Sequence, residues 1–205
     1  MKRSDKNTLY FMLRVVGYAA IMVLLNVIYM HDAGEITSTG KFGENSLTEI
    51  FQEVFLFMLG IIFIFVSRRD RDLQAIANLL SLFFFMAFIR EFNNQIDYWF
   101  YLVLPVLFLA GWLAFRDRKK LMPSLNTLVQ IPETAYLVTG FLVTFIFSRF
   151  FGRTALWETI LGEDYNRWAK NAAEEGIELL GYSLLLIAGV EILWRVCHNR
   201  VKQGT

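Results

Sequence analysis

The sequence predicts an all-α membrane protein that crosses the bilayer six times. Three observations lead to this prediction. First, 56% of the 205 residues are hydrophobic, whereas soluble globular chains are about 45–50% apolar. Second, the apolar residues gather into six stretches, each close to the ~20 residues that cross the hydrocarbon core as a helix. Third, the lysines and arginines are enriched in every second segment between these stretches.

The predicted transmembrane helices are the six apolar stretches themselves. The first is longer than the apolar core of a signal peptide, so we expect it to be retained as a helix. Several others are short, and their ends are expected to extend through polar residues at the membrane interface. No repeat or linker divides the chain, which we treat as a single six-helix bundle. The stretches are residues 9–30, 47–66, 73–89, 98–115, 135–151 and 177–196.

The distribution of Lys and Arg predicts that both termini lie in the cytoplasm. Cytoplasmic loops of membrane proteins carry an excess of these residues. With the N-terminus inside, the inner segments hold 14 of the 20 Lys and Arg residues, and the outer segments hold six. If one helix had been missed or added, segments rich in Lys and Arg would no longer alternate with segments poor in them. We therefore predict a multi-pass cell-membrane protein, and the absence of an N-x-S/T acceptor site favours a bacterial cytoplasmic (inner) membrane.

The segment between the fifth and sixth stretches, residues 154–171, is predicted to form an amphipathic helix on the outer face. Within it Trp157, Ile160, Leu161, Tyr165 and Trp168 fall near helical spacing. A helix with such an apolar stripe lies in the plane of the interface, where Trp is enriched at headgroup depth. We expect this interfacial helix to roof the outer end of the bundle.

Ionisable residues within membrane segments are costly and are therefore candidates for function. The second stretch begins with Glu49 and Glu53, which are one helical turn apart and share a face. Arg90 and Glu91 end the third stretch and are expected at the same outer level. The alternative explanation is that these helices begin later or end earlier, which would leave the same groups solvated at the surface.

The sixth stretch adds Glu178 and Tyr182, again one turn apart. Acids in a first helical turn also complement the helix dipole, and this structural explanation fits Glu174 and Glu175 better than Glu178. Arg149, near the end of the fifth stretch, is expected at the same depth. The predicted outer polar site is therefore an acidic cluster with two arginines, made of Glu49, Glu53, Arg90, Glu91, Arg149, Glu178 and Tyr182.

Clustered carboxylates indicate a cation as ligand. A divalent Ca²⁺, Mg²⁺ or Mn²⁺ prefers oxygen ligands, and Glu49, Glu53 and Glu178 are the candidate metal ligands. A proton would suit the cluster equally well, because close carboxylates cannot all be ionised. An arginine could instead hold the phosphate headgroup of a lipid. At the inner end of the sixth stretch, Glu191 and Arg195 are predicted to form a structural ion pair.

Several classes of protein are excluded by what the sequence lacks. The only histidines, His31 and His198, are expected at opposite membrane faces, so they cannot form a bis-histidine haem site. No H-E-x-x-H zinc motif and no glycine-rich nucleotide-binding loop is present. The formal net charge of +1 gives no indication of a nucleic-acid partner. The expected partners are the lipid bilayer and a small cation or a lipid headgroup.

Three functions are compatible with these features. The first is a binding or transport protein, with an outward-facing site for a cation, a proton or a polar or cationic solute. The second is a membrane-embedded, divalent-metal-dependent hydrolase or transferase acting on a lipid-type substrate, in which the carboxylates hold the metal that activates water. The third is a structural or accessory subunit. Polar contacts between membrane helices contribute only ~0.6–2 kcal/mol each, so the third function would require a network.

Overall fold

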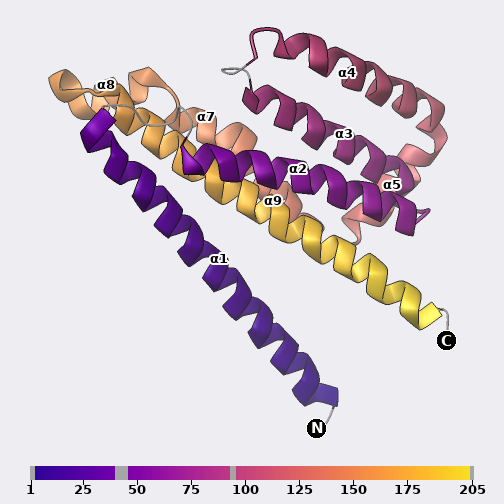
Figure 1. Ribbon diagram of the computed structural model, residues 1–205. Helices are drawn as coiled ribbons and strands as arrows, with labels where there is room; N and C mark the ends of the chain where they lie inside the picture. Colours follow the sequence, from indigo (N-terminus) through magenta and orange to yellow (C-terminus); the bar gives the residue numbers. More distant parts are fainter. Residues whose placement is uncertain (1–2, 40–45, 93–95, 204–205) are drawn as a thin grey trace.

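The computed structural model describes residues 3–39, 46–92 and 96–203, and over these ranges it consists of helices joined by turns (Figure 1). Six helical segments are long and apolar enough to cross a membrane. The predicted all-α chain with six candidate spans is thus confirmed, while its orientation in a membrane stays a prediction. One of the six Lys and Arg residues of the predicted outer segments, Lys41, lies outside the described residues. The spans are Thr8–Gly34, Leu47–Arg69, Gln74–Glu91, Trp99–Arg116, Thr134–Phe151 and Arg167–His198.

The fifth span is assembled from three consecutive pieces, α6, a π-helical turn and α7. The short helix α5 connects the fourth span to the fifth, and the short helix α8 lies between the fifth span and the sixth. In chain order the elements are α1 (Arg3–Thr39), α2 (Leu47–Arg69), α3 (Gln74–Glu91), α4 (Trp99–Arg116), α5 (Arg118–Val129), α6 (Thr134–Leu142), the π-helical turn (Val143–Phe147), α7 (Ser148–Phe151), α8 (Thr154–Leu161), a 3₁₀ turn (Gly162–Asp164) and α9 (Arg167–Gln203).

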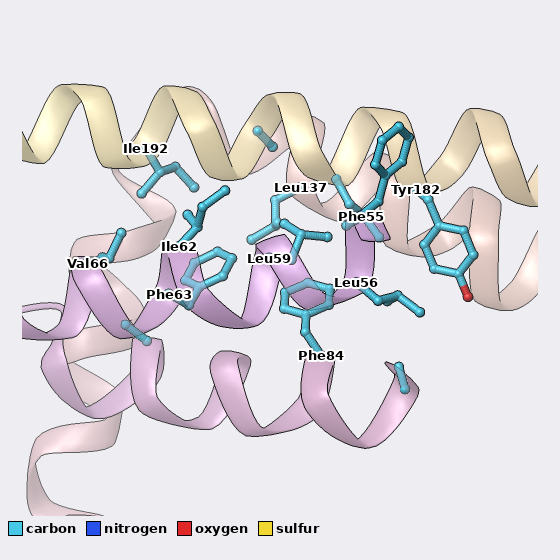
Figure 2. Packing of buried hydrophobic residues seen from close by; sticks show 14 of the residues in the cluster. Phe55, Leu56, Leu59, Ile62, Phe63, Val66, Phe84, Leu137, Tyr182 and Ile192 are labelled. Atoms are coloured by element: carbon cyan, nitrogen blue, oxygen red, sulfur yellow. The ribbon is translucent and has the colours of Figure 1, made fainter. Parts of the chain in front are cut away.

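Helices α2 and α9 pack against each other in the middle of the bundle and supply most of its core. Leu59 of α2 and Ile192 of α9 are fully buried and lie in the same cluster (Figure 2). Phe84 of α3 stacks on Phe63 of α2, with ring centroids 5.6 Å apart. Helices in lipid associate through close packing, because the lipid tails are as apolar as the side chains. This interlocking therefore fixes how α2, α3 and α9 are placed relative to one another.

Helices α1 and α4 lie at the periphery. No residue of α4 is buried, and α1 diverges from the bundle toward its N-terminal end (Figure 1). On α1, the buried residues Leu25, Ile28 and Asp32 belong to the half nearer to its C-terminal end. Large apolar side chains such as Phe108 of α4 remain exposed. In a bilayer, lipid tails would cover these faces.

Two of the predicted boundaries are wrong. Helix α9 begins at Arg167, well before residue 177, because residues 167–176 are mostly Ala, Glu and Lys, which are polar or small but form helices readily. Residues 154–171 are not one helix, because α8 ends at Leu161 and Gly162 adopts a φ of 58°. A residue with a positive φ cannot continue a right-handed helix, so Trp168 belongs to α9 and the predicted stripe is divided.

The inner polar residues of α9 contact other elements of the bundle. Arg195 binds Glu133, in the turn before α6, through two hydrogen bonds of 2.8 and 2.5 Å. Glu191 pairs with Arg14 of α1 at 3.2 Å and accepts a hydrogen bond from Tyr18. The predicted Glu191–Arg195 ion pair is therefore wrong, because each group has a partner on a neighbouring element. The two contacts connect α9 with α1 and with the start of the fifth span.

The Glu133–Arg195 contact predicts a pH-dependent stability. Burial opposes ionisation of Glu133, but the hydrogen bonds from Arg195 and from the backbone, together with the positive charges of Arg195 and Arg14, outweigh it and hold the pKa of this carboxyl below its usual value. A lowered folded-state pKa means that the contact stabilises the fold fully above the usual carboxyl pKa of about 4.3. The contribution is lost as the pH falls through the lowered folded-state value.

We expect Glu133→Gln to lower the melting temperature at pH 7 by about 2–4 °C, the shift that ~1 kcal/mol produces in a chain of this size. The difference from the wild type should shrink below about pH 4, because the protonated glutamate then resembles glutamine. Thermal unfolding of both proteins in the same detergent, followed by circular dichroism, measures this. A difference that does not change with pH would contradict the role given to the ionised pair.

Candidate functional site

A polar cavity of about 390 Å³ is lined by residues at helix ends, and these helix ends lie away from the two chain termini (Figure 1). Its volume is within the ~300–1,000 Å³ typical of small-molecule sites. The start of α2, the end of α3, α7 and the first part of α9 form its walls. Every lining side chain is polar or charged: Glu49, Gln52, Glu53, Arg90, Glu91, Arg149, Glu174, Glu175 and Glu178.

The start of α2 is fixed by two capping side chains. Ser46 accepts a hydrogen bond from the Glu49 amide at 3.2 Å, as an N-cap residue does. Asp32 of α1 is buried and caps the same turn from the neighbouring helix. Its carboxylate accepts hydrogen bonds from the Leu47 amide at 3.2 Å and from the amide and hydroxyl of Thr48 at 2.7 and 2.6 Å. These contacts set where α2 begins and so position its cavity-lining acids.

Replacing Asp32 with alanine is expected to destabilise the protein by about 2 kcal/mol, the upper end of the range for a lost cap. The cost is at this upper end because three donors at the start of α2 would lose their buried acceptor. Asp32→Asn keeps one acceptor oxygen and should lose less. Chemical or thermal unfolding in detergent measures both variants. Equal stability of Asp32→Ala and the wild type would show that Asp32 does not hold the start of α2.

On α3, Arg90 and Glu91 form an ion pair of 2.8 Å at the end of the helix. The hydroxyl of Tyr182, a fully buried residue of α9, donates a hydrogen bond of 3.1 Å to the same Glu91 oxygen. Tyr182 therefore lies behind the cavity wall and holds Glu91 in place. Through this contact the end of α3 is tied to α9.

Arg149 of α7 bridges two acids of α9. Its guanidinium lies 2.8 Å from Glu174 and 2.7 Å from Glu178. Ser148 donates a second hydrogen bond to Glu178 at 3.2 Å, and Lys170 lies 3.6 Å from Glu174. Glu178 is almost completely buried, whereas about half of the Arg149 side chain is exposed. This bridge holds α7 against α9.

Two further acids of the cavity, Glu53 and Glu175, have no cationic partner among the described residues. Gln52 is buried and donates its side-chain amide to the Glu175 carboxylate at 3.0 Å. A neutral amide does not compensate a charge. Among the residues that the structure describes, Glu53 makes no hydrogen bond or ion pair through its carboxylate. The two arginines thus compensate Glu91, Glu174 and Glu178, and leave Glu53 and Glu175 without a cationic partner.

The charges of the cavity are therefore unbalanced. Six carboxylates and two arginines line it. Carboxylates that share a poorly hydrated space cannot all be ionised unless a positive charge joins them. A proton or a bound cation would supply that charge. The arrangement thus attracts cations more strongly than anions.

No group of three or more His, Cys, Asp or Glu side chains within the described part of the chain has the geometry to hold a metal ion. The predicted metal ligands Glu49, Glu53 and Glu178 all line the cavity, but they do not form such a group. The divalent metal stays a prediction.

Six of the seven residues predicted for the site line this cavity, and the seventh, Tyr182, contacts it through Glu91. The structure adds Gln52, Glu174 and Glu175, which the sequence analysis left out of the site. Helical spacing could have indicated all three, because Gln52 is three residues after Glu49, and Glu174 and Glu175 are four and three residues before Glu178. The predicted roof of residues 157–168 contributes none of the lining residues. Whether the cavity binds anything stays a prediction.

Comparison of the chain with family models, with curated proteins and with solved structures found no match. The chemistry of the cavity is therefore the basis on which a function can be proposed.

Proposed function

We propose that this integral membrane protein binds a cation, a proton or a cationic solute in the polar cavity, which opens toward the outer side of the membrane. One observation carries the proposal. A cavity of about 390 Å³, formed at the ends of candidate membrane spans, is lined by six carboxylates and two arginines. Charged groups within membrane spans are energetically costly, so a cluster of them at such positions indicates a function.

The distribution of basic residues supports the proposed orientation. Arg68 and Arg69 end α2, Arg116 ends α4, and Arg118 begins α5. These helix ends are opposite to those that form the cavity, since the cavity uses the start of α2 and the end of α3. Cytoplasmic ends of membrane helices are rich in Arg and Lys. Both termini would then be cytoplasmic and the cavity would face outward.

Glu53 is the residue that we assign to primary contact with the cation. It lines the cavity, and its carboxylate has no hydrogen-bond or ion-pair partner among the described residues. The other cavity acids with a resolved partner would have to exchange that partner for the ligand. Binding of a cation at Glu53 requires no such exchange, so the free-energy cost of binding is lowest at this residue.

We expect Glu53→Gln to weaken binding of methylammonium or Na⁺ by about tenfold, the equivalent of 1.4 kcal/mol, because one carboxylate is lost from the ligand shell. Isothermal titration calorimetry on the purified protein in detergent measures the affinity. Glu158→Gln, on α8 and outside the cavity, removes the same charge and is the matched control. Melting temperatures of both variants should equal that of the wild type.

Uptake of radiolabelled methylammonium into proteoliposomes then separates transport from binding alone. If the wild type takes up methylammonium and Glu53→Gln does not, the cation is translocated through this site. Binding without uptake would restrict the function to a binding protein. Equal affinities of the wild type, Glu53→Gln and Glu158→Gln would overturn the proposed site.

A structural role is the second candidate, and the Arg149 bridge favours it. The ion pairs of Arg149 with Glu174 and Glu178 join α7 to α9. Such networks are often structural even where ionisable groups are clustered. If the cavity served only this purpose, the wild type would show no saturable binding of either probe.

A further inference from the structure

A second cavity adjoins the polar one and shares Arg90 with it. Its volume is about 240 Å³, and it lies between α3, α4 and the π-helical turn. Apart from Arg90, every residue that lines it is apolar: Phe83, Met86, Ala87, Trp99, Val103 and Phe145. Arg90 thus stands at the boundary between an acidic cavity and an apolar one.

The position of the second cavity suits a hydrocarbon chain. Trp99 and Val103 come from the first turns of α4, and Met86 and Ala87 from the last turns of α3. This end of the two helices is also the end at which Arg90 reaches the polar cavity. Because no residue of α4 is buried, the second cavity lies near the periphery of the bundle, where lipid tails would be close by in a bilayer.

We propose that the two cavities together bind one amphiphile, with an amine headgroup among the carboxylates and a hydrocarbon chain between α3 and α4. The inference rests on the proposed function, since the headgroup is the cation assigned to the polar cavity. Small-molecule sites are typically apolar with a few polar groups that fix orientation. The two cavities, which share Arg90 as a lining residue, provide both parts, whereas an inorganic cation would use only one.

Charge complementarity selects an amine over an anionic headgroup. The polar cavity has six carboxylates and two arginines, and both arginines are already engaged, Arg90 by Glu91 and Arg149 by Glu174 and Glu178. An anion would have to displace these acids and remain close to the others. An ammonium group instead supplies the positive charge that Glu53 and Glu175 lack.

A third cavity, between α1 and α9, is also largely apolar and measures about 390 Å³. It shares no lining residue with the polar cavity. The α9 residues that line it alternate along the helix with the acids that line the polar cavity, so α9 itself lies between a chain placed there and the carboxylates. The α3–α4 cavity is therefore the one that we assign to the chain.

The experiment compares dodecylamine, butylamine and dodecanoate in phosphatidylcholine nanodiscs that contain the full chain, with empty nanodiscs subtracted. Dodecylamine is expected to bind about tenfold tighter than butylamine, because only its chain reaches the second cavity. Dodecanoate, which has the opposite charge, should not compete with dodecylamine. Val103→Trp fills the second cavity and should reduce the affinity for dodecylamine to that for butylamine. Leu102→Trp, on the exposed side of α4, is the matched control and should keep the difference.

Each outcome separates this inference from the proposed function. If both amines bind equally and Glu53→Gln weakens both, the amphiphile is excluded while the cation site stands. If neither amine nor Na⁺ binds saturably, the proposed function itself fails. If dodecanoate competes with dodecylamine as strongly as butylamine does, the site does not select an amine headgroup. A preference for dodecylamine that persists in Val103→Trp would exclude the α3–α4 cavity as the place of the chain.

Discussion

Gly181→Ala is expected to destabilise the protein by about 2–3 kcal/mol, as overpacking of a close contact does. This loss would outweigh the ~1 kcal/mol by which alanine favours a helix over glycine. A Cβ on Gly181 would lie 2.0 Å from the Thr144 hydroxyl oxygen and 2.8 Å from the Thr144 backbone nitrogen. The hydroxyl can rotate away. The backbone nitrogen can move only if the π-helical turn separates from α9.

Gly111→Ala is the matched control for this prediction. Gly111 is within α4, and a Cβ there would meet no atom within 4 Å. We expect its melting temperature to equal or exceed that of the wild type, and that of Gly181→Ala to fall by about 5–10 °C. Gly140→Ala should act in the same direction as Gly181→Ala, because its Cβ would lie 2.9 Å from the Leu185 backbone nitrogen. A Gly181→Ala protein as stable as Gly111→Ala would contradict the close approach of the fifth span to α9.

This close approach also bears on the cavity, because the π-helical turn directly precedes Ser148 and Arg149. A π-helical turn accommodates an extra residue in a helix and is frequent at functional sites. One residue corresponds to about 100° of rotation around a helix. The turn therefore changes the direction in which α7 presents its side chains, and in this structure Arg149 contacts Glu174 and Glu178 of α9.

The number of candidate spans could be predicted from the sequence because it depends on the length of apolar runs, which the thickness of a bilayer fixes. Helix ends could not be predicted in the same way. Residues 167–176 are polar enough to end an apolar run, yet they continue α9, because helix formation depends on backbone propensity as well as on hydropathy. The division of residues 154–171 at Gly162 was also missed, since a glycine within an apolar pattern does not by itself show a left-handed φ.

That Glu53 and Arg90 lie at the same end of the bundle could be predicted, because the position of a residue along a span follows from the rise per residue. The neighbours of each helix could not. That α9 packs beside α2 depends on interlocking side chains such as Leu59 and Ile192, and such complementarity leaves no periodic signal. For the same reason the partners of Glu191 were missed, since they come from α1.

Arg149→Gln is the second change with a large expected effect. It leaves Glu174 and the almost completely buried Glu178 without their arginine. Removing one partner of a buried ion pair costs ~3–5 kcal/mol. Because about half of the Arg149 side chain is exposed, water would solvate part of the change, and we expect a loss of about 2–3 kcal/mol.

The double variant Arg149→Gln, Glu178→Gln tests whether this loss comes from the uncompensated charge. Two neutral amides can bond to each other and to Ser148, so the double variant should be more stable than Arg149→Gln alone, in unfolding measurements made in one detergent. If the loss came only from the missing bulk of arginine, the second substitution would not restore stability. In that case the carboxylate of Glu178 would have to be compensated by another group. The charge excess that underlies the proposed cation site would then be smaller than the lining of the cavity indicates.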